Sequence, residues 1–251
     1  MTIEIPAITN PGVSFTENSY EIIRGVHEFF HDTNVTRISY KDFQKAYMRV
    51  DPKGDSKIRM LFPLLRKAGC IYPDDGGNVV FHNGSFFTQL GESFFKISSL
   101  YYQAKRRAKS IPKNEANTAA AIILKARGIY SKVAMTLFRN LCEQEDVYRH
   151  LLQFVAQYGP VSKDEIQILL YSLAKTSSNP GSVVSCTYDT KEISDLMDKF
   201  RRGTLKCTSK KDNNAAGYFI SVLKTLLVVD ENHGSYVVSE EFKVNSKGVK
   251  Q

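Results

Sequence analysis

The sequence predicts a mainly helical protein of the α+β class, built from two similar units joined by a helical middle. Three observations lead to this prediction. Apolar residues recur at helical spacing over most of the chain. Two segments have the pattern of a strand, a glycine-containing turn and a second strand. A helix followed by such a segment occurs in both halves of the sequence.

The first half starts with residues 1–16, which are rich in Pro, Gly, Thr and Asn and which we expect to form an extended arm. A short β-branched segment precedes Ser39, which can cap a helix because Asp42 follows three residues later. Pro63 should kink or shorten the third helix, and residues 70–81 should form a hairpin. The helices expected here are 20–31, 39–50, 55–69 and about 91–109.

The second half starts with a break at Ile111–Asn114, and Gly159-Pro160 ends the helical middle. Residues 175–190 are polar and rich in Gly, Pro and Ser, which predicts a loop, and residues 228–239 should form the second hairpin. The expected helices are about 115–128, 130–143, 146–158, one from the 161–165 segment to about 174, 192–200 and 213–227.

The third helix and its hairpin align without a gap with the last helix and its hairpin when the sequence is shifted by 158 residues. The segment Ile38–Asp42 resembles Val161–Asp164 at a shift of 123, so the second copy contains an insertion of 35 residues around 171–208. The matched core positions are Leu61, Phe62, Leu64 and Leu65 with Phe219, Ile220, Val222 and Leu223.

Each unit therefore consists of a helix, a short strand, two further helices and a hairpin. This order resembles the winged-helix fold, a helix-turn-helix with a β-hairpin wing, over roughly 17–105 and 145–244. The expected organisation is an arm at 1–16, a first unit with a C-terminal linker helix at 17–110, a helical linker at 111–144, a second unit at 145–245 with the insertion at about 171–208, and a tail at 246–251.

The composition is that of a globular protein with a basic surface. Of 251 residues, 42% are hydrophobic, enough for a packed core, which excludes wholesale disorder, collagen, coiled coils and disulfide scaffolds. There are 34 Lys and Arg against 26 Asp and Glu, a formal charge of +8. This excess favours anionic partners, with nucleic acid ahead of a membrane surface.

No motif predicts a membrane segment, a metal site or a cofactor. The N-terminus lacks a basic stretch followed by an apolar run, and no apolar stretch reaches 18 residues. The four Cys and five His are scattered without ligand spacing. We expect free thiols in a cytoplasmic protein, nucleoid-associated if the source is bacterial.

The resemblance implies that the third helix of each unit enters the major groove, with its N-terminal side chains at the base edges. Asn at such a position can pair with adenine, whereas Lys and Arg suit phosphates or guanine. The wing tips are acidic, with Asp74 and Asp75 in one and Asp230 and Glu231 in the other, and we do not expect them near phosphates. The candidate DNA-binding residues on these helices are Lys53, Ser56, Lys57 and Arg59 in the first unit, and Lys210, Lys211, Asn213 and Asn214 in the second.

Two further basic clusters would supply phosphate contacts. One is Lys105, Arg106, Arg107 and Lys109; the other is Arg201, Arg202 and Lys206, leading into Lys210 and Lys211.

The sequence thus predicts a DNA-binding protein with no catalytic residues of its own. A transcription regulator, a replication initiator and the recognition part of a restriction or defence system all fit, with a second copy of the chain or another protein as a further partner. One alternative is a winged-helix protein-interaction subunit. Another is a Mg²⁺-dependent nuclease, because Asp230, Glu241 and Lys243 imitate the spacing of restriction-type sites.

Overall fold

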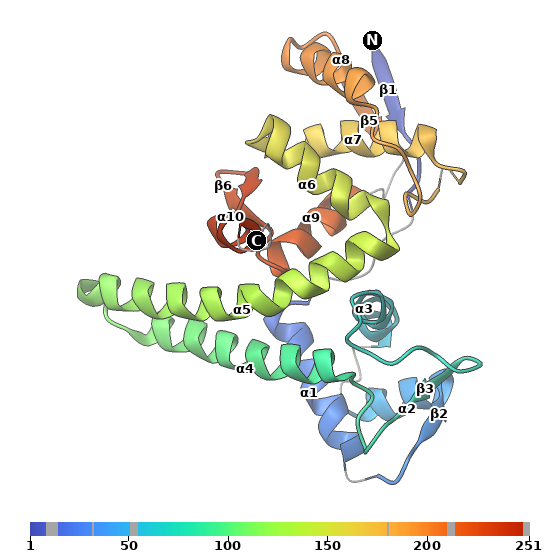
Figure 1. The fold of residues 1–251 in the computed structure, drawn as a ribbon, viewed down its shortest axis with the longest axis vertical. Coiled ribbons are helices and arrows are strands. Elements are labelled where there is room, and N and C mark those ends of the chain that lie inside the picture. The colour runs from blue at the N-terminus through green and yellow to red at the C-terminus, as the bar shows by residue number, and fades with distance from the viewer. Residues whose placement is uncertain (9–14, 32, 51–54, 180, 210–213, 248–251) are drawn as a thin grey trace. The chain divides into compact units, whose positions relative to one another are not determined.

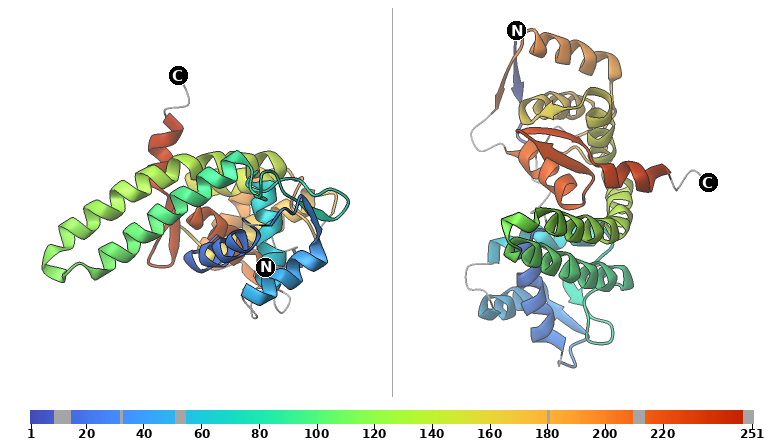
Figure 2. Two further views of the ribbon diagram at one scale, coloured as in Figure 1. Left: turned by 90° about the horizontal axis from the view of Figure 1, so that it is seen from below. Right: turned by 90° about the vertical axis from the view of Figure 1, so that its left-hand side faces the viewer.

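The computed structural model describes residues 1–8, 15–31, 33–50, 55–179, 181–209 and 214–247. The protein is mainly helical with small sheets, which confirms the predicted class. Its internal contacts divide it into two compact units, residues 12–137 and residues 1–11 with 138–251 (Figures 1 and 2). We call residues 12–137 the middle unit and residues 1–11 with 138–251 the outer unit, after their order along the chain.

The middle unit is built on an aromatic core. Phe43 stacks on Phe30 with ring centroids 5.2 Å apart and lies 5.0 Å from Phe62, which in turn lies 5.6 Å from Phe86. Strands β2 and β3 pair antiparallel beside this core. The elements are α1 (Glu17–His31), β2 (Arg37–Ser39), α2 (Tyr40–Val50), α3 (Asp55–Lys67), β3 (Asn78–Val80), α4 (Gln89–Ser110), a 3₁₀ turn (Lys113–Glu115) and the first part of α5 (Ala116–Gln144).

The hairpin expected at residues 70–81 forms only at its turn. Gly76 and Gly77 have φ of +57° and +79°, as a tight two-residue turn requires. The residues expected to form the first strand, 70–72, directly precede Pro73, which has no N–H to donate, and Ile71 bridges Phe87 instead of the returning strand. The returning strand, β3, pairs with β2.

The outer unit contains the hairpin predicted at residues 228–239. Strands β6 and β7 join at a His233–Gly234 turn with φ of +49° and +78°, and β4 adds to β7, giving the order β4-β7-β6. The elements are β1 (Thr2–Ile5), the rest of α5, α6 (Asp146–Tyr158), β4 (Val161–Ser162), α7 (Lys163–Thr176), α8 (Thr190–Arg201), β5 (Lys206–Ser209), α9 (Ala215–Thr225), β6 (Val229–Asn232), β7 (Ser235–Val238) and α10 (Glu240–Lys247).

Residues 2–5 form a strand of the outer unit and not an extended arm. Strand β1 pairs in parallel with β5, with Ile3 opposite Cys207 (Figure 1). Ile3 and Ile5 are buried, whereas Thr2 and Glu4 between them are exposed. This alternation with a period of two is the pattern of a half-buried strand, which the turn-forming residues further along 1–16 obscured.

Most of the expected linker, from residue 116 to 144, is one continuous helix. Helix α5 runs for 29 residues through Gly128, where we expected a break, because one glycine inside a helix costs only about 1 kcal/mol. The boundary between the two units falls inside α5, between Leu137 and Phe138. At the C-terminus, α10 continues to Lys247, past the expected start of the tail at 246.

The internal repeat is visible where α3 and α9 end. Gly69 and Leu227, which the 158-residue shift aligns, both have positive φ (+78° and +54°). Each is followed by a residue whose N–H bonds to the carbonyl five residues earlier, as in a Schellman cap. The two bonds are Cys70 N–H to Leu65 O at 2.8 Å and Val228 N–H to Leu223 O at 2.9 Å.

Candidate nucleic-acid interface

The structure describes about half of the predicted DNA-binding side chains. Lys53, Lys210, Lys211 and Asn213 lie outside the described residues. Ser56, Lys57 and Arg59 lie in the first turns of α3, where only the backbone is described. The side chains that can be placed are Lys105, Arg106, Arg107, Lys109, Arg201, Arg202, Lys206 and Asn214.

The cluster at the end of α4 divides into side chains that contact the middle unit and side chains that face solvent. The ammonium of Lys105 lies 5.4 Å from the ring centroid of Tyr101 and 5.8 Å from that of Tyr102. Arg107 and Lys109 are exposed, and neither has an ion pair with a described residue. Within this cluster, Arg107 and Lys109 are therefore the side chains that offer a charge without a contact to another described side chain.

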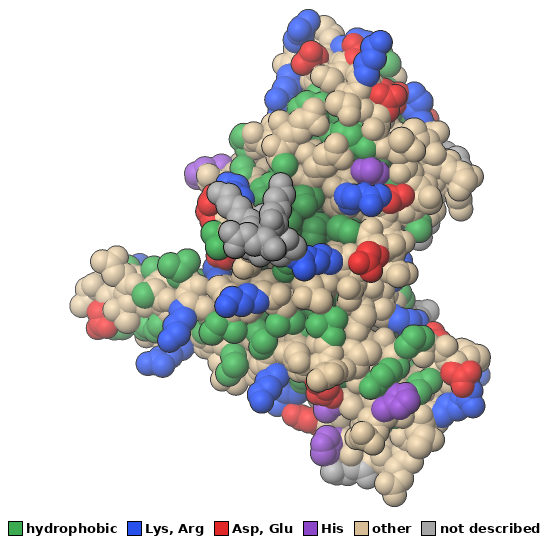
Figure 3. Space-filling model, viewed as in Figure 1, with side chains coloured by type: hydrophobic (Ala, Val, Ile, Leu, Met, Phe, Trp, Pro, Cys, Tyr) green, Lys and Arg blue, Asp and Glu red, His purple; other side chains and the backbone are tan. Residues whose placement is uncertain are grey.

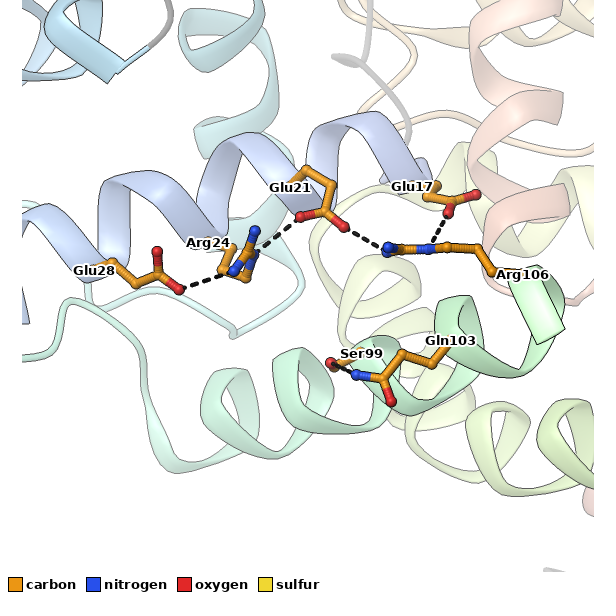
Figure 4. Close-up of polar contacts among 7 residues, drawn as sticks. All are labelled: Glu17, Glu21, Arg24, Glu28, Ser99, Gln103 and Arg106. Atoms are coloured by element: carbon orange, nitrogen blue, oxygen red, sulfur yellow. Dashed lines mark hydrogen bonds and ion pairs between the residues drawn. The ribbon is translucent and has the colours of Figure 1, made fainter.

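Arg106 ties α4 to α1 (Figure 4). Its Nε lies 2.9 Å from Glu17 and its Nη2 lies 2.5 Å from Glu21. Glu21 also pairs with Arg24 at 3.0 Å, and Arg24 pairs with Glu28 at 3.1 Å. The guanidinium of Arg106 therefore forms ion pairs with two carboxylates of its own unit, and its contact with phosphate stays a prediction.

Arg201 has a similar structural position in the outer unit. Its Nε donates to Glu165 at 2.7 Å, and Nη2 donates to the carbonyl of Tyr158 at 3.1 Å. Glu165 accepts from the N–H of Ser162 at 2.6 Å, and Ser162 caps α7 in return. Burial raises the pKa of Glu165, but the bonds from Ser162 and Arg201 outweigh it and hold that pKa below its usual value.

Lys163 and Asn214 join the first residue of α7 to the residue that precedes α9. The ammonium of Lys163 donates to Oδ1 of Asn214 at 2.5 Å, and both residues are exposed. Helix α7 packs against α8, α9 and β5, so several outer-unit cations are carried on elements around one helix. Sequence reasoning missed Lys163, although its place directly after the Ser162 cap marks it as a first-turn residue of α7.

Arg202 directly follows α8, Lys206 is the first residue of β5, and both are exposed. Neither has an ion pair with a described residue, whereas Lys199 on α8 pairs with Asp195 at 2.6 Å. Figure 3 shows Lys and Arg spread over one face of the molecule singly or in small groups, without a continuous basic patch. The candidate DNA-binding side chains of the outer unit are thus Arg202, Lys206 and the Lys163–Asn214 pair.

Acidic residues of both turns that were predicted to be wing tips form ion pairs with basic residues of their own units. In the middle unit Arg66 pairs with Asp74 at 2.5 Å, and Arg37 pairs with Asp75. In the outer unit Lys224 pairs with Glu231. Their negative charge is therefore partly compensated before any ligand approaches.

The three residues whose spacing resembles a nuclease site lie on two different elements. Asp230 lies in β6, while Glu241 and Lys243 lie on α10, where Lys243 pairs with Glu240 at 2.6 Å. Within the described ranges, no three His, Cys, Asp or Glu side chains come together in a way that could hold a metal ion.

Comparison with known proteins finds no match. No protein-family model, no curated protein and no solved structure is similar to this chain. Among the described residues, no helix combines the length and the apolar character needed to cross a membrane.

Proposed function

We propose that the protein binds duplex DNA, without catalysis, through a winged-helix unit formed by residues 146–238. The observation that carries the proposal is the order of elements in the outer unit: α6, β4, α7 and then, after the inserted α8 and β5, α9 and the β6–β7 hairpin, with β4 added to the returning strand β7. In a winged helix this arrangement presents the third helix, here α9, to the major groove.

The charges around this unit support the same proposal. Arg202 and Lys206 are exposed and have no ion pair in the described part of the chain, so they can neutralise phosphates. Lys163 is the first residue of α7, and Asn214 directly precedes α9. In a winged helix, side chains at the N-terminal end of the recognition helix, here α9, read the bases.

We assign the middle unit a supporting part in the same activity. The cap that ends its α3 matches the cap that ends α9 of the outer unit, but its hairpin is paired differently, and the exposed cations of its predicted basic cluster are Arg107 and Lys109. A protein that binds duplex DNA without cutting it suits transcription control, replication initiation or the recognition step of a restriction or defence system.

The test is fluorescence anisotropy with a random-sequence duplex, measured from 50 to 200 mM salt. Arg202→Met with Lys206→Met should weaken binding to all sequences and lower the slope of log K against log salt by about two. Lys125→Met with Lys132→Met removes the same charge from exposed positions of α5 and should leave the slope unchanged. Wild-type protein that does not bind at 50 mM salt would refute the proposal.

A further inference from the structure

Helix α4 and the middle-unit part of α5 run antiparallel to each other, joined through the turn at Lys113–Glu115 (Figures 1 and 2). The ring of Tyr130 on α5 lies 4.6 Å from that of Tyr101 on α4, so these two positions mark the seam between the helices. Helix α1 packs on α4 to one side of this seam, where the rings of Tyr20 and Tyr102 lie 5.5 Å apart. The two helices leave apolar side chains exposed on the other side.

Each helix of this pair has a second row of apolar residues beside the seam. Residues three, four or seven positions apart lie on one face of a helix, and both rows follow this spacing. Leu100 is 56% exposed and Ile129 is 47% exposed, whereas the other members of the rows are half-buried. The row on α4 is Ile97, Leu100, Ala104 and Ile111, and the row on α5 is Ile122, Ala126, Ile129 and Val133.

The two rows lie on the same face of the helix pair. A helix turns by about 100° per residue, which places the α4 row about 70° from Tyr101 and the α5 row about 70° from Tyr130. The displacement has the same rotational sense in both helices when each is viewed from its N-terminus. Because the helices are antiparallel, equal displacements bring both rows to one side, which is the side of α4 opposite Tyr102 and α1. We call these eight residues the apolar face.

Basic residues border the apolar face on both helices. Between Ser93 and Cys142 the chain has ten Lys and Arg but only one acidic residue, Glu115. Figure 3 shows hydrophobic side chains along α4 and α5 with Lys and Arg beside them. Four exposed cations lie next to the two rows, and none of them has an ion pair with a described residue: Lys96, Arg107, Lys125 and Lys132.

These charges determine which partner fits the apolar face. A second copy of the chain would bring its own cations against these cations, and like charges that meet across an interface oppose binding. A nucleic acid would match the charge, but its phosphates offer nothing to apolar side chains such as Leu100 and Ile129. The complementary partner combines an apolar surface with acidic residues beside it.

The sizes of the side chains favour a helix over a lipid bilayer. Ala104 and Ala126 lie near the seam, and the larger Leu100 and Ile129 lie further from it, so a third helix can approach the centre of the face. Helices that insert into a bilayer surface usually carry Trp, Phe or Leu, whereas the apolar face has no aromatic residue and a single Leu. The face is therefore suited to a helix that completes a bundle of three.

We propose that the apolar face binds an amphipathic helix of a partner protein whose apolar stripe is flanked by Asp and Glu. The stripe covers the exposed parts of Leu100 and Ile129, and the flanking carboxylates pair with the four cations that border the face. The α4 row spans 15 residues, about 21 Å, so a partner helix of four turns or more can cover it. This activity goes beyond DNA binding and does not depend on it.

The test uses synthetic peptides of about 21 residues, three heptads, in fluorescence anisotropy at about 150 mM salt. The acidic peptide has Leu at positions a and d, Glu at e and g, and Ala or Gln elsewhere. The basic peptide has Lys in place of each Glu, and a third peptide has the acidic composition in scrambled order. Wild type should bind the acidic peptide at least about ten-fold more tightly than either control peptide.

Paired substitutions locate the binding surface. Leu100→Gln with Ile129→Gln should weaken binding of the acidic peptide by about ten-fold or more, because it removes apolar contacts without changing the charge. Leu124→Gln is the matched control: Leu124 is 67% exposed but lies on the other side of α5, so this variant should bind as wild type does. Lys125→Met with Lys132→Met should weaken binding by about five-fold, and its effect should shrink at high salt.

Thermal melting should show that all these variants are folded, since each replaced side chain is largely exposed. The proposal is overturned if wild type does not bind the acidic peptide, or if Leu100→Gln with Ile129→Gln binds it as tightly as wild type does. Two other results also overturn it, because they assign the face to another occupant. One is sedimentation of wild type, but not of this double variant, with phosphatidylcholine vesicles containing about 30% phosphatidylserine; the other is a dimer in analytical ultracentrifugation that the same variant abolishes.

Discussion

Replacing Arg201 by Met should destabilise the outer unit because Arg201 compensates a buried carboxylate. The side chain of Glu165 is only 10% exposed and accepts from Arg201 at 2.7 Å and from Ser162 at 2.6 Å. Met retains the length of the aliphatic part but removes the charged donor. Glu165 is then left buried with backbone and hydroxyl partners alone.

The expected loss follows from the cost of leaving such a group without its charged partner, about 1–3 kcal/mol of the free energy of unfolding. A change of about 1 kcal/mol shifts the melting temperature of a domain of this size by about 4 °C, so we expect a decrease of about 4–12 °C. Circular dichroism during heating at pH 7 measures it. Arg202→Met is the matched control, because Arg202 is exposed and has no ion pair among the described residues.

The pH dependence gives a second readout. The pKa of Glu165 is lower in the folded protein than its ordinary value, so the carboxylate contributes stability at pH values above the unfolded pKa of about 4.3. This contribution is lost as the pH falls through the folded pKa. The difference between wild type and Arg201→Met should therefore be largest at neutral pH and shrink below about pH 4. Equal melting temperatures of wild type and Arg201→Met at pH 7 would refute the reasoning.

Three further predictions concern packing. Gly91→Ala should destabilise the middle unit by about 1–3 kcal/mol in urea unfolding, because its Cβ would lie 2.0 Å from the Cys70 carbonyl oxygen. Gly128→Ala is the matched variant: its Cβ meets open space, so it should stabilise the middle unit by about 0.5–1 kcal/mol. Ile5→Ala should cost the outer unit about 2–5 kcal/mol, and unchanged unfolding would show that β1 is not part of that unit. Burial raises the pKa of Cys70, so mass spectrometry should find its thiol unmodified by a thiol reagent in native protein and modified in urea.

Regular patterns allowed the helices to be predicted from the sequence. The apolar spacing of α1, α6 and α8 identified these helices to within a few residues, because each buries one face. The 158-residue repeat aligned Gly69 with Leu227, a match that the structure extends to the hydrogen bonds of the caps.

Pairing between distant segments could not be predicted in the same way. Strand β1 has only four residues, and its partner, β5, lies in the insertion. The sequence around Ile71 is typical of a β-strand, and it would be the same whether Ile71 paired with β3 or, as observed, with Phe87. A local pattern predicts that a segment is extended but not which strand it will bind.

The candidate site shows a comparable limit for charge. Arg106 and Arg201 look like phosphate ligands within basic runs, but their partners, Glu21 and Glu165, lie 85 and 36 residues away. Lys163 stands outside every basic run and was missed for that reason. Which cations are free depends on acidic partners that only the fold brings near.

The pairing of β1 with β5 has a consequence for the order in which the chain can fold during synthesis. Lys206 comes 201 positions after Ile5, and ribosomes add about 5–20 residues per second. Strand β1 therefore waits about 10–40 seconds for its partner, with Ile3 and Ile5 not yet buried against β5. The whole middle unit emerges during this interval and can fold first, so the strand that is synthesised first is among the last to pair.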